Sequence, residues 1–217
     1  MTELTMVHFG DSITFGQYVD PASRWTTLLE DRLRPAVEAT DVELVIQNRG
    51  VSGETTRQAL ERYPEDVQSV APDILTLQFG LNDCNRWATD GGLPRVSEQA
   101  YVANLHEMIE RARRFGVRRI IVANNHPTLR DDDYERGNAR YGELACEVAA
   151  DQGTVFCDIR GAFIEFSVAE LAELLLPLPD VLHLSEEGNR VYADAMEPFV
   201  RAAIEEAAGV RLTAGRR

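Results

Sequence analysis

Residues 73–79 read DILTLQF, a nearly continuous apolar run that is followed closely by the polar pair Asn82 and Asp83. A second run of this kind, RIIVA, covers residues 119–123. Strands that face water on one side alternate apolar and polar residues, whereas strands of a parallel sheet are covered on both faces and read as apolar runs. The two runs therefore predict buried parallel strands at 73–79 and 117–123.

The rest of the chain alternates short β-type segments with longer helical ones. Apolar residues at helical spacing predict the helices, and short β-branched runs predict the other strands. The further expected strands are 4–9, 42–47 and 154–157, and the expected helices are 22–39, 55–70, 99–115, 134–151 and 185–208. Such alternation predicts an α/β fold, in which a parallel sheet carries helices on both faces.

Length and charge limit the classes of protein and partner. The chain has 217 residues, with 22 Lys and Arg against 36 Asp and Glu, which gives a formal net charge of −14. This length favours a single domain, which we expect to span residues 1–208, with a mobile tail at 209–217. A chain this acidic is repelled by nucleic acid and by anionic membrane surfaces, so neither is an expected partner.

The cysteines and the hydropathy pattern bear on location. The three cysteines, Cys84, Cys146 and Cys157, are too few for a disulfide framework and lack CxxC spacing, so we expect reduced thiols, two of them buried. The N-terminal residues MTELTMVHFG do not resemble a signal peptide, and no apolar run approaches the roughly 20 residues of a membrane span. These features favour a cytoplasmic protein without membrane insertion, and we expect neither a metal nor another cofactor.

Function in parallel α/β folds collects in the loops that follow the carboxyl ends of the strands. Five such segments should therefore lie side by side: 10–16, 48–55, 80–97, 124–135 and 177–184.

The first and last of these segments carry a nucleophile candidate and a base candidate. Ser12 stands where a strand ends and a helical turn begins, so it is either a nucleophile or a helix cap. Asp180 and His183 are three residues apart, so one turn can bring the carboxylate to Nδ1 of the imidazole and leave Nε2 for the nucleophile. His126 is the only competing base, because His8 and His106 lie inside a predicted strand and helix.

The middle segments carry candidate oxyanion donors. Asn82 has an amide that can donate a hydrogen bond to a developing oxyanion without adding a titratable charge. Residues 48–56 read NRGVSGETT, and the glycines allow close approach of the backbone. This is not the GxSxG elbow of α/β-hydrolases, because Glu54 stands where the last glycine would be. Ser52 is therefore only a weak nucleophile candidate.

Four short blocks together resemble the SGNH or GDSL hydrolases. They are GDSIT at 10–14, SGETT at 52–56, GLND at 80–83 and DVLH at 180–183, in the order and spacing of that family. One departure is mild, because Ile13 stands where the family name has leucine. The resemblance implies a flavodoxin-like three-layer α/β/α sandwich with a five-stranded parallel sheet in the order 2-1-3-4-5.

The resemblance also implies the roles of individual residues. Ser12 is then the nucleophile, His183 the general base and Asp180 the residue that orients it. The oxyanion hole would consist of the backbone N–H groups of Ser12 and Gly53 and the side chain of Asn82. The implied activity is that of a serine hydrolase acting on a small-molecule carboxylic ester or thioester.

The loop 83–97 is longer than the usual strand-to-helix link, so it is a candidate substrate wall or lid beside the site. We take Asp11, Trp87, Asn124 and His126 as candidate substrate contacts. A polar crevice of this kind favours a short-acyl or carbohydrate ester over a long lipid tail, which needs an apolar groove.

Several alternatives stay open at this point. A lysophospholipase, a thioesterase or an acyltransferase would use the same residues with a different acyl chain or acceptor. A metal-dependent phosphoesterase would use Asp11, Asn82, Asp83 and His183 as ligands, although such sites need more histidines than this region has. A non-catalytic binding module on the same fold is also open, but every member of the triad is present.

Overall fold

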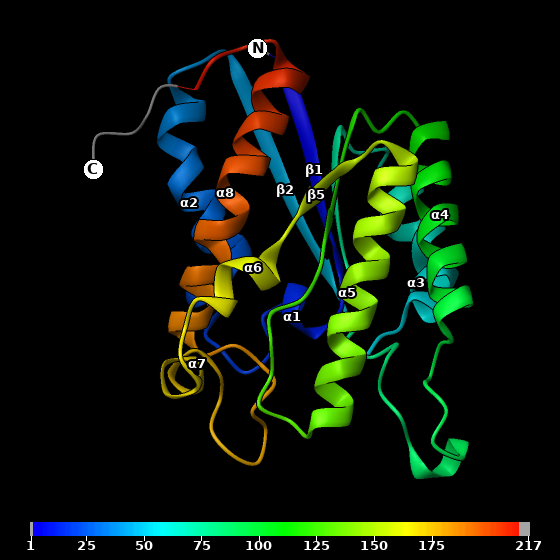
Figure 1. Cartoon of the computed structure of the whole chain (residues 1–217). Helices are drawn as coiled ribbons and strands as arrows, with labels where there is room; N and C mark the ends of the chain where they lie inside the picture. The colour runs from blue at the N-terminus through cyan, green and yellow to red at the C-terminus, as the bar shows by residue number, and fades with distance from the viewer. Residues whose placement is uncertain (1, 213–217) are drawn as a thin grey trace.

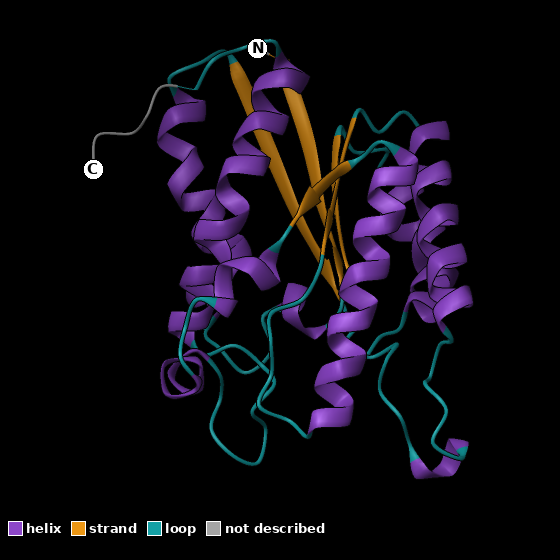
Figure 2. Cartoon of the chain, in the orientation of Figure 1, coloured by secondary structure: helices purple, strands orange, loops and turns teal. Residues whose placement is uncertain are grey.

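The computed structural model describes residues 2–212 and is built around a five-stranded parallel sheet (Figures 1 and 2). Its strands are β1 (Thr2–Gly10), β2 (Val42–Gly50), β3 (Ile74–Gln78), β4 (Arg119–Ala123) and β5 (Val155–Cys157). They lie in the order β2-β1-β3-β4-β5, and every neighbouring pair is parallel. The predicted α/β class and the strand order 2-1-3-4-5 are both confirmed.

Helices cover both faces of the sheet and complete the three layers (Figure 1). One face carries α2 (Trp25–Glu38), α6 (Ile159–Ile164) and α8 (Glu186–Ala208), with α7 (Val168–Leu174) against α8. The other face carries α3 (Thr56–Tyr63), α4 (Glu98–Arg114) and α5 (Asp132–Gln152). Short turns of helix, α1 (Ser12–Phe15), η1 (Pro21–Ser23) and η3 (Ala88–Asp90), lie in the connecting segments.

The strand register brings the carboxyl ends of the strands into one row. Gly10 of β1 pairs with Gly50 on one side and with Gln78 on the other, and Gln78 pairs with Ala123. The loops after four strands therefore begin side by side, at the lower end of the sheet in Figure 2. Gly10 has no space for a side chain, because a Cβ there would lie 2.1 Å from Oγ1 of Thr14.

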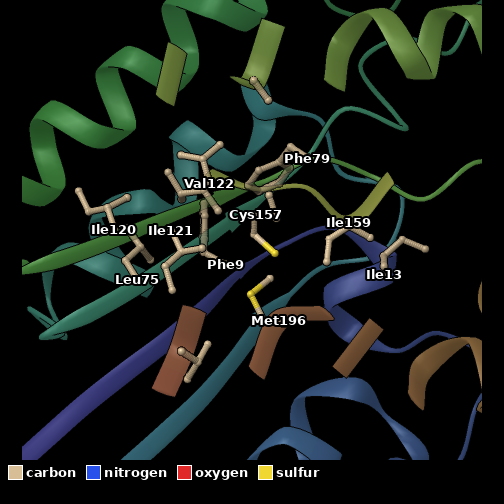
Figure 3. Packing of buried hydrophobic residues seen from close by; sticks show 14 of the residues in the cluster. Phe9, Ile13, Leu75, Phe79, Ile120, Ile121, Val122, Cys157, Ile159 and Met196 are labelled. Atoms are coloured by element: carbon tan, nitrogen blue, oxygen red, sulfur yellow. The ribbon is translucent and has the colours of Figure 1, made fainter. Parts of the chain in front are cut away.

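The core lies between the sheet and its two helical layers. Figure 3 shows Phe9 and Phe79 among the aliphatic side chains of β3 and β4, with Cys157 facing Met196 of α8. Cys84 and Cys157 are buried and Cys146 is exposed, so the expectation of two buried thiols is confirmed. Burial raises the pKa of both buried thiols to about 12, which keeps them protonated.

Three elements differ from the sequence-based expectation. The helix expected over 55–70 ends at Tyr63 and continues as a π-helical turn, η2 (Pro64–Gln68), closed by a hydrogen bond of 2.9 Å from the Ser69 amide to the Pro64 carbonyl. Pro64 has no N–H to continue the α-helical pattern. Helices α6 and α7 were not predicted, although Ser167 and Glu170 form a capping box that signals the start of α7.

The last described residues contact helix α8. Leu212 is buried, and its amide donates a hydrogen bond of 2.8 Å to a carboxylate oxygen of Glu205. Part of the tail expected at 209–217 is therefore held against the core, and residues 213–217 lie outside those described. Among residues 2–212, no helix has the length and apolar character needed to cross a bilayer.

Candidate functional site

Ser12 opens helix α1, two residues after the end of β1. Asp11 rather than Ser12 caps this helix, because its Oδ1 accepts a hydrogen bond of 2.9 Å from the Ile13 amide. The Ser12 hydroxyl is therefore free for another partner, and it lies 2.9 Å from Nε2 of His183. The helix-cap interpretation of Ser12 is wrong, and the side chain is directed to the histidine.

The His183 ring is held from its other side by Asp180. Nδ1 lies 2.8 Å from Oδ2 of Asp180, while Oδ1 of the same carboxylate accepts bonds from the His183 and Leu182 amides. Partial burial alone would raise the pKa of Asp180, but these hydrogen bonds outweigh it and leave the pKa below its usual range. An ionised Asp180 fixes the tautomer with the proton on Nδ1, which leaves Nε2 as an acceptor for the Ser12 hydroxyl.

These groups open into a cavity of about 310 Å³. Its walls come from all five loops that the topology brings together, which confirms the predicted clustering. The lining residues are Ser12, Gln17, Ser52, Gly53, Leu81, Asn82, Asn85, Arg130, Tyr134, Leu182 and His183. Most of these side chains carry a polar group, although apolar atoms form the larger part of the surface that faces the cavity.

The two further candidate oxyanion donors are both held by neighbouring side chains. Gly53 has a φ of +77°, a conformation that L side chains rarely adopt, and its carbonyl accepts a bond of 2.9 Å from Arg95. The Asn82 amide nitrogen lies 3.3 Å from Oδ2 of Asp11. Gly53 and Asn82 line the same cavity as Ser12.

Asp11 was expected to contact substrate, but it is completely buried below the cavity. Its carboxylate is occupied by Ile13 and Asn82, so it has a supporting position. Burial, assisted by the nearby charge of Asp83, raises the pKa of Asp11 to about 7. The hydrogen bonds it accepts limit this rise.

Asn124 and His126 also lie outside the cavity, contrary to expectation. Asn124 donates a hydrogen bond of 2.7 Å to Asp158 and is buried between β4 and α6. His126 is completely buried, and its Nε2 lies 2.8 Å from the carbonyl oxygen of Leu182. Burial lowers the pKa of His126 to about 4, so the ring is neutral near pH 7 and donates to that carbonyl.

Trp87 lies in a second, adjacent cavity of about 620 Å³ rather than in the first. It belongs to the segment 83–97, which we call the arm. The arm is closed at its base by backbone hydrogen bonds from Arg95 to Asn85 and from Val96 to Asp83, of 2.9 and 3.1 Å. It projects from the sheet at the lower right of Figure 1.

Sequence reasoning missed Arg62, which connects two parts of the site. Its guanidinium donates hydrogen bonds to both carboxylate oxygens of Glu54, directly after Gly53, one of 2.6 Å to Asp66 and one of 3.2 Å to the carbonyl of Gly10. It also lies 4.1 Å from the centre of the Phe9 ring. Nothing in the spacing of Glu54 and Arg62 indicates this contact, because it depends on how α3 meets the end of β1.

Tyr18 was missed as well. Its ring meets the His183 ring edge to face at 5.2 Å between centroids, and the side chain is 69% exposed. Its φ of +69° is uncommon for a residue with a side chain.

Within residues 2–212, no three His, Cys, Asp or Glu side chains are grouped to hold a metal ion, so the ligand set considered for a phosphoesterase is not assembled.

Known proteins place this geometry in context. A lipoprotein of Bacillus subtilis, YqeF, is 34% identical over 122 residues, which is 54% of this chain and 46% of that protein. The chain thus matches less than half of the length of this relative. An acetylxylan esterase of Geobacillus stearothermophilus is 27% identical over 160 residues, which is 69% of each protein.

The fold is shared with solved structures. A catalytic mutant of the acetylxylan esterase Axe2 from Geobacillus stearothermophilus superimposes with a TM-score of 0.75 at 23% identity, over 98% of this chain and 99% of the other. The family model described as the GDSL-like lipase/acylhydrolase family matches residues 8–191, a range that includes Ser12, Gly53, Asn82 and His183. The chain therefore belongs to the GDSL-like lipase/acylhydrolase family.

Proposed function

We propose that this protein is a carboxylic ester hydrolase with Ser12 as nucleophile, His183 as general base and Asp180 as the residue that orients the base. The observation that carries the proposal is the continuous relay from Ser12 Oγ to His183 Nε2 at 2.9 Å and from His183 Nδ1 to Asp180 at 2.8 Å, beside an open cavity. Family membership makes acyl-transfer chemistry the expected reaction at such a relay.

The proposed reaction has two acyl-transfer steps. Nε2 of His183 takes the Ser12 proton as Oγ attacks the ester carbonyl, and the same nitrogen returns the proton to the leaving alcohol. Water, deprotonated by His183, then attacks the acyl-Ser12 carbonyl, the acyl–Oγ bond breaks, and His183 returns the proton to Ser12 Oγ as the carboxylic acid leaves. Asp180 stays ionised and stabilises the transient imidazolium.

The oxyanion formed in each step is expected to be bound by the Ser12 and Gly53 backbone N–H groups and by the Asn82 amide. Each such donor is worth about 3–4 kcal/mol to the transition state in comparable enzymes. The position of Asn82 is supported by its contact with Asp11, and that of Gly53 by the bond from Arg95 to its carbonyl.

The substrate we propose is a short-acyl ester, with a carbohydrate as the favoured alcohol. A long alkyl chain needs an extended apolar groove, whereas this cavity holds about 310 Å³ and most of its lining side chains carry a polar group. The relative named acetylxylan esterase supports the same direction. A thioesterase, lysophospholipase or acyltransferase would share the catalytic residues, so the acyl chain and acceptor distinguish them.

The nucleophile is tested by two serine variants of the same cavity. Ser12→Ala is expected to lower kcat for p-nitrophenyl acetate by at least about 10³-fold, because no acyl-enzyme can form. Ser52→Ala, which lines the cavity without contacting His183, is the matched control and should lose less than about tenfold. Retained activity in Ser12→Ala, or equal losses in both variants, would contradict the assignment.

The acyl preference is tested with p-nitrophenyl esters of increasing chain length. The highest kcat/KM is expected for acetate or butyrate, with a decline towards laurate as the chain outgrows the polar cavity. A maximum at laurate would favour a lipid or thioester substrate instead, while leaving the catalytic residues unaffected.

A further inference from the structure

The cavity of about 620 Å³ that contains Trp87 is a second concave surface beside the proposed catalytic centre. It is lined by Thr55, Arg57, Gln58, Trp87, Asp90, Leu93, Pro94, Arg95 and Ser97. The two cavities have separate linings but share their supporting segments. Gly53 faces the first cavity and Thr55 the second, and the arm contributes Asn85 to the first and Trp87 to the second.

Trp87 is the aromatic side chain of this surface, where it lies with the exposed Leu93. Trp87 is 48% exposed, whereas Trp25, the other tryptophan of the chain, is completely buried. The Arg95 guanidinium lies 4.5 Å from the centre of the Trp87 ring and covers part of it. The ring is therefore held in place by a cation–π contact while about half of its surface faces solvent.

Arg95 connects the Trp87 ring to Gly53 and to the start of α3. Besides its contact with Trp87, it donates a hydrogen bond of 2.9 Å to the Gly53 carbonyl and one of 3.2 Å to Oε1 of Gln58. Gln58 in turn forms the capping box of α3 with Thr55. One side chain thus fixes both the aromatic platform and the glycine next to which an ester carbonyl would bind.

The chemistry of this surface suits one class of ligand. A pyranose ring has an apolar C–H face that stacks on an aromatic ring and hydroxyl groups around its edge that need hydrogen-bond partners. Here the platform is Trp87, and hydroxyl, amide, carboxylate and guanidinium groups surround it on Thr55, Gln58, Asp90 and Arg57. A lipid tail would instead require a continuous apolar lining.

We propose that the Trp87 cavity binds a sugar unit of the alcohol part of the substrate, so that an ester on that unit or on its neighbour reaches Ser12. This inference rests on the proposed function, because it assigns the alcohol side of the same substrate. It makes Trp87 a determinant of specificity rather than of the chemical step, and Arg95 the residue that connects Trp87 to Gly53.

The test compares two esters and one sugar that lacks an ester. For Trp87→Ala, the ratio of kcat/KM on acetylated xylotetraose to that on p-nitrophenyl acetate should fall by at least about tenfold, and Trp87→Phe should fall less. Phe115→Ala is the matched control, because Phe115 is similarly exposed, at 46%, and follows the far end of α4. Its ratio should not change.

Binding without turnover separates this inference from the proposed function. Xylotetraose added to Ser12→Ala should shift the fluorescence of the exposed Trp87, and calorimetry should show a Kd at least about tenfold weaker in Ser12→Ala/Trp87→Ala. An unchanged ratio and an unchanged Kd would overturn the sugar subsite even if p-nitrophenyl acetate is hydrolysed. Loss of all esterase activity with intact sugar binding would overturn the proposed function and leave the subsite in place.

Discussion

His183 and His126 lie on neighbouring loops at the carboxyl edge of the sheet, yet their surroundings are opposite. His183 is partly exposed and contacts Ser12 and Asp180 through its two ring nitrogens. His126 is completely buried, its pKa is lowered to about 4, and it contacts the carbonyl of Leu182, the residue before His183. One histidine is placed to exchange a proton, and the other holds the loop on which the first depends.

The two aspartates that accompany these regions show the same division. The pKa of Asp180 lies below its usual range because amide and imidazole hydrogen bonds outweigh its partial burial. The pKa of Asp11 is raised to about 7 because its burial is complete. The comparison teaches that burial and partners decide the role of a residue at this edge, since the residue types are the same.

The largest effect is expected when each of the two histidines is replaced by glutamine in turn. His183→Gln removes the base and should lower kcat for p-nitrophenyl acetate by roughly 10²–10⁴-fold. His126→Gln retains an N–H donor for the Leu182 carbonyl and should cost less than about tenfold. Steady-state kinetics on both variants provides the measurement, and the reverse order of losses would make His126 the base.

A second effect follows from the ionisation of Asp11. Between its ordinary pKa of 3.8 and its folded pKa of about 7, the folded protein keeps the proton that the unfolded chain releases. The contribution of Asp11 to the free energy of unfolding therefore falls as pH rises through this window, by about 4 kcal/mol at about 1.4 kcal/mol per unit. Asp11→Asn removes this dependence.

Urea unfolding of wild type and Asp11→Asn at several pH values between 4 and 8 measures the effect. The difference in unfolding free energy between the two proteins should move in favour of the variant as pH rises. Asp83, whose pKa burial raises to about 6, acts in the same direction in both proteins, and its repulsion of Asp11 is part of the difference that Asp11→Asn measures. A difference that is constant across the range would refute the raised pKa of Asp11.

A third, smaller effect compares a buried ion pair with an exposed one. Arg62→Met leaves the buried carboxylate of Glu54 without its partner and should lower the unfolding free energy by about 3 kcal/mol. Arg190→Met breaks an exposed pair with Glu187 and should cost less than about 1 kcal/mol. Denaturant unfolding gives both values, and equal losses would show that burial of the Arg62 pair is unimportant.

A second substitution, at Glu54, tests whether the unpaired charge causes the loss of stability in Arg62→Met. Glu54→Leu added to Arg62→Met removes the unpaired charge, so a large part of the lost stability should return. If the loss persists, the contacts of Arg62 with Asp66, Phe9 and the Gly10 carbonyl account for it instead.

Much of the fold could be predicted because apolar runs and helical spacing report burial directly. The strands 74–78 and 119–123 are buried along nearly their whole length, which is why their sequences were decisive. The break at Pro64 was harder, since a proline can end a helix or be absorbed by a π-helical turn. Helices α6 and α7 were missed because they are short and depend on packing against α8.

The sequence predicts which loop each site residue belongs to, and therefore its approximate position, but not the direction of its side chain. Ser12, Gly53, Asn82 and His183 all line the cavity because the strand register brings their loops together. Asp11, Asn124 and His126 belong to the same loops but point into the protein, and a sequence carries no signal for that direction. Arg62 and Tyr18 approach from a helix and a turn, so their contacts depend on tertiary packing alone.

The hydrogen bonds at the base of the arm separate substitutions in the arm from the position of the proposed catalytic residues. Asn85 and Arg95 are bonded to each other, so the chain leaves β3 and returns to α4 at nearly one point. Residues between them can be lengthened, shortened or exchanged without moving Asn82, in the way that closed surface loops accept insertions. Selectivity can thus diverge through residues 86–94, which include Trp87, while Asn85 and Arg95, with its bond to the Gly53 carbonyl, stay in place beside the catalytic cavity.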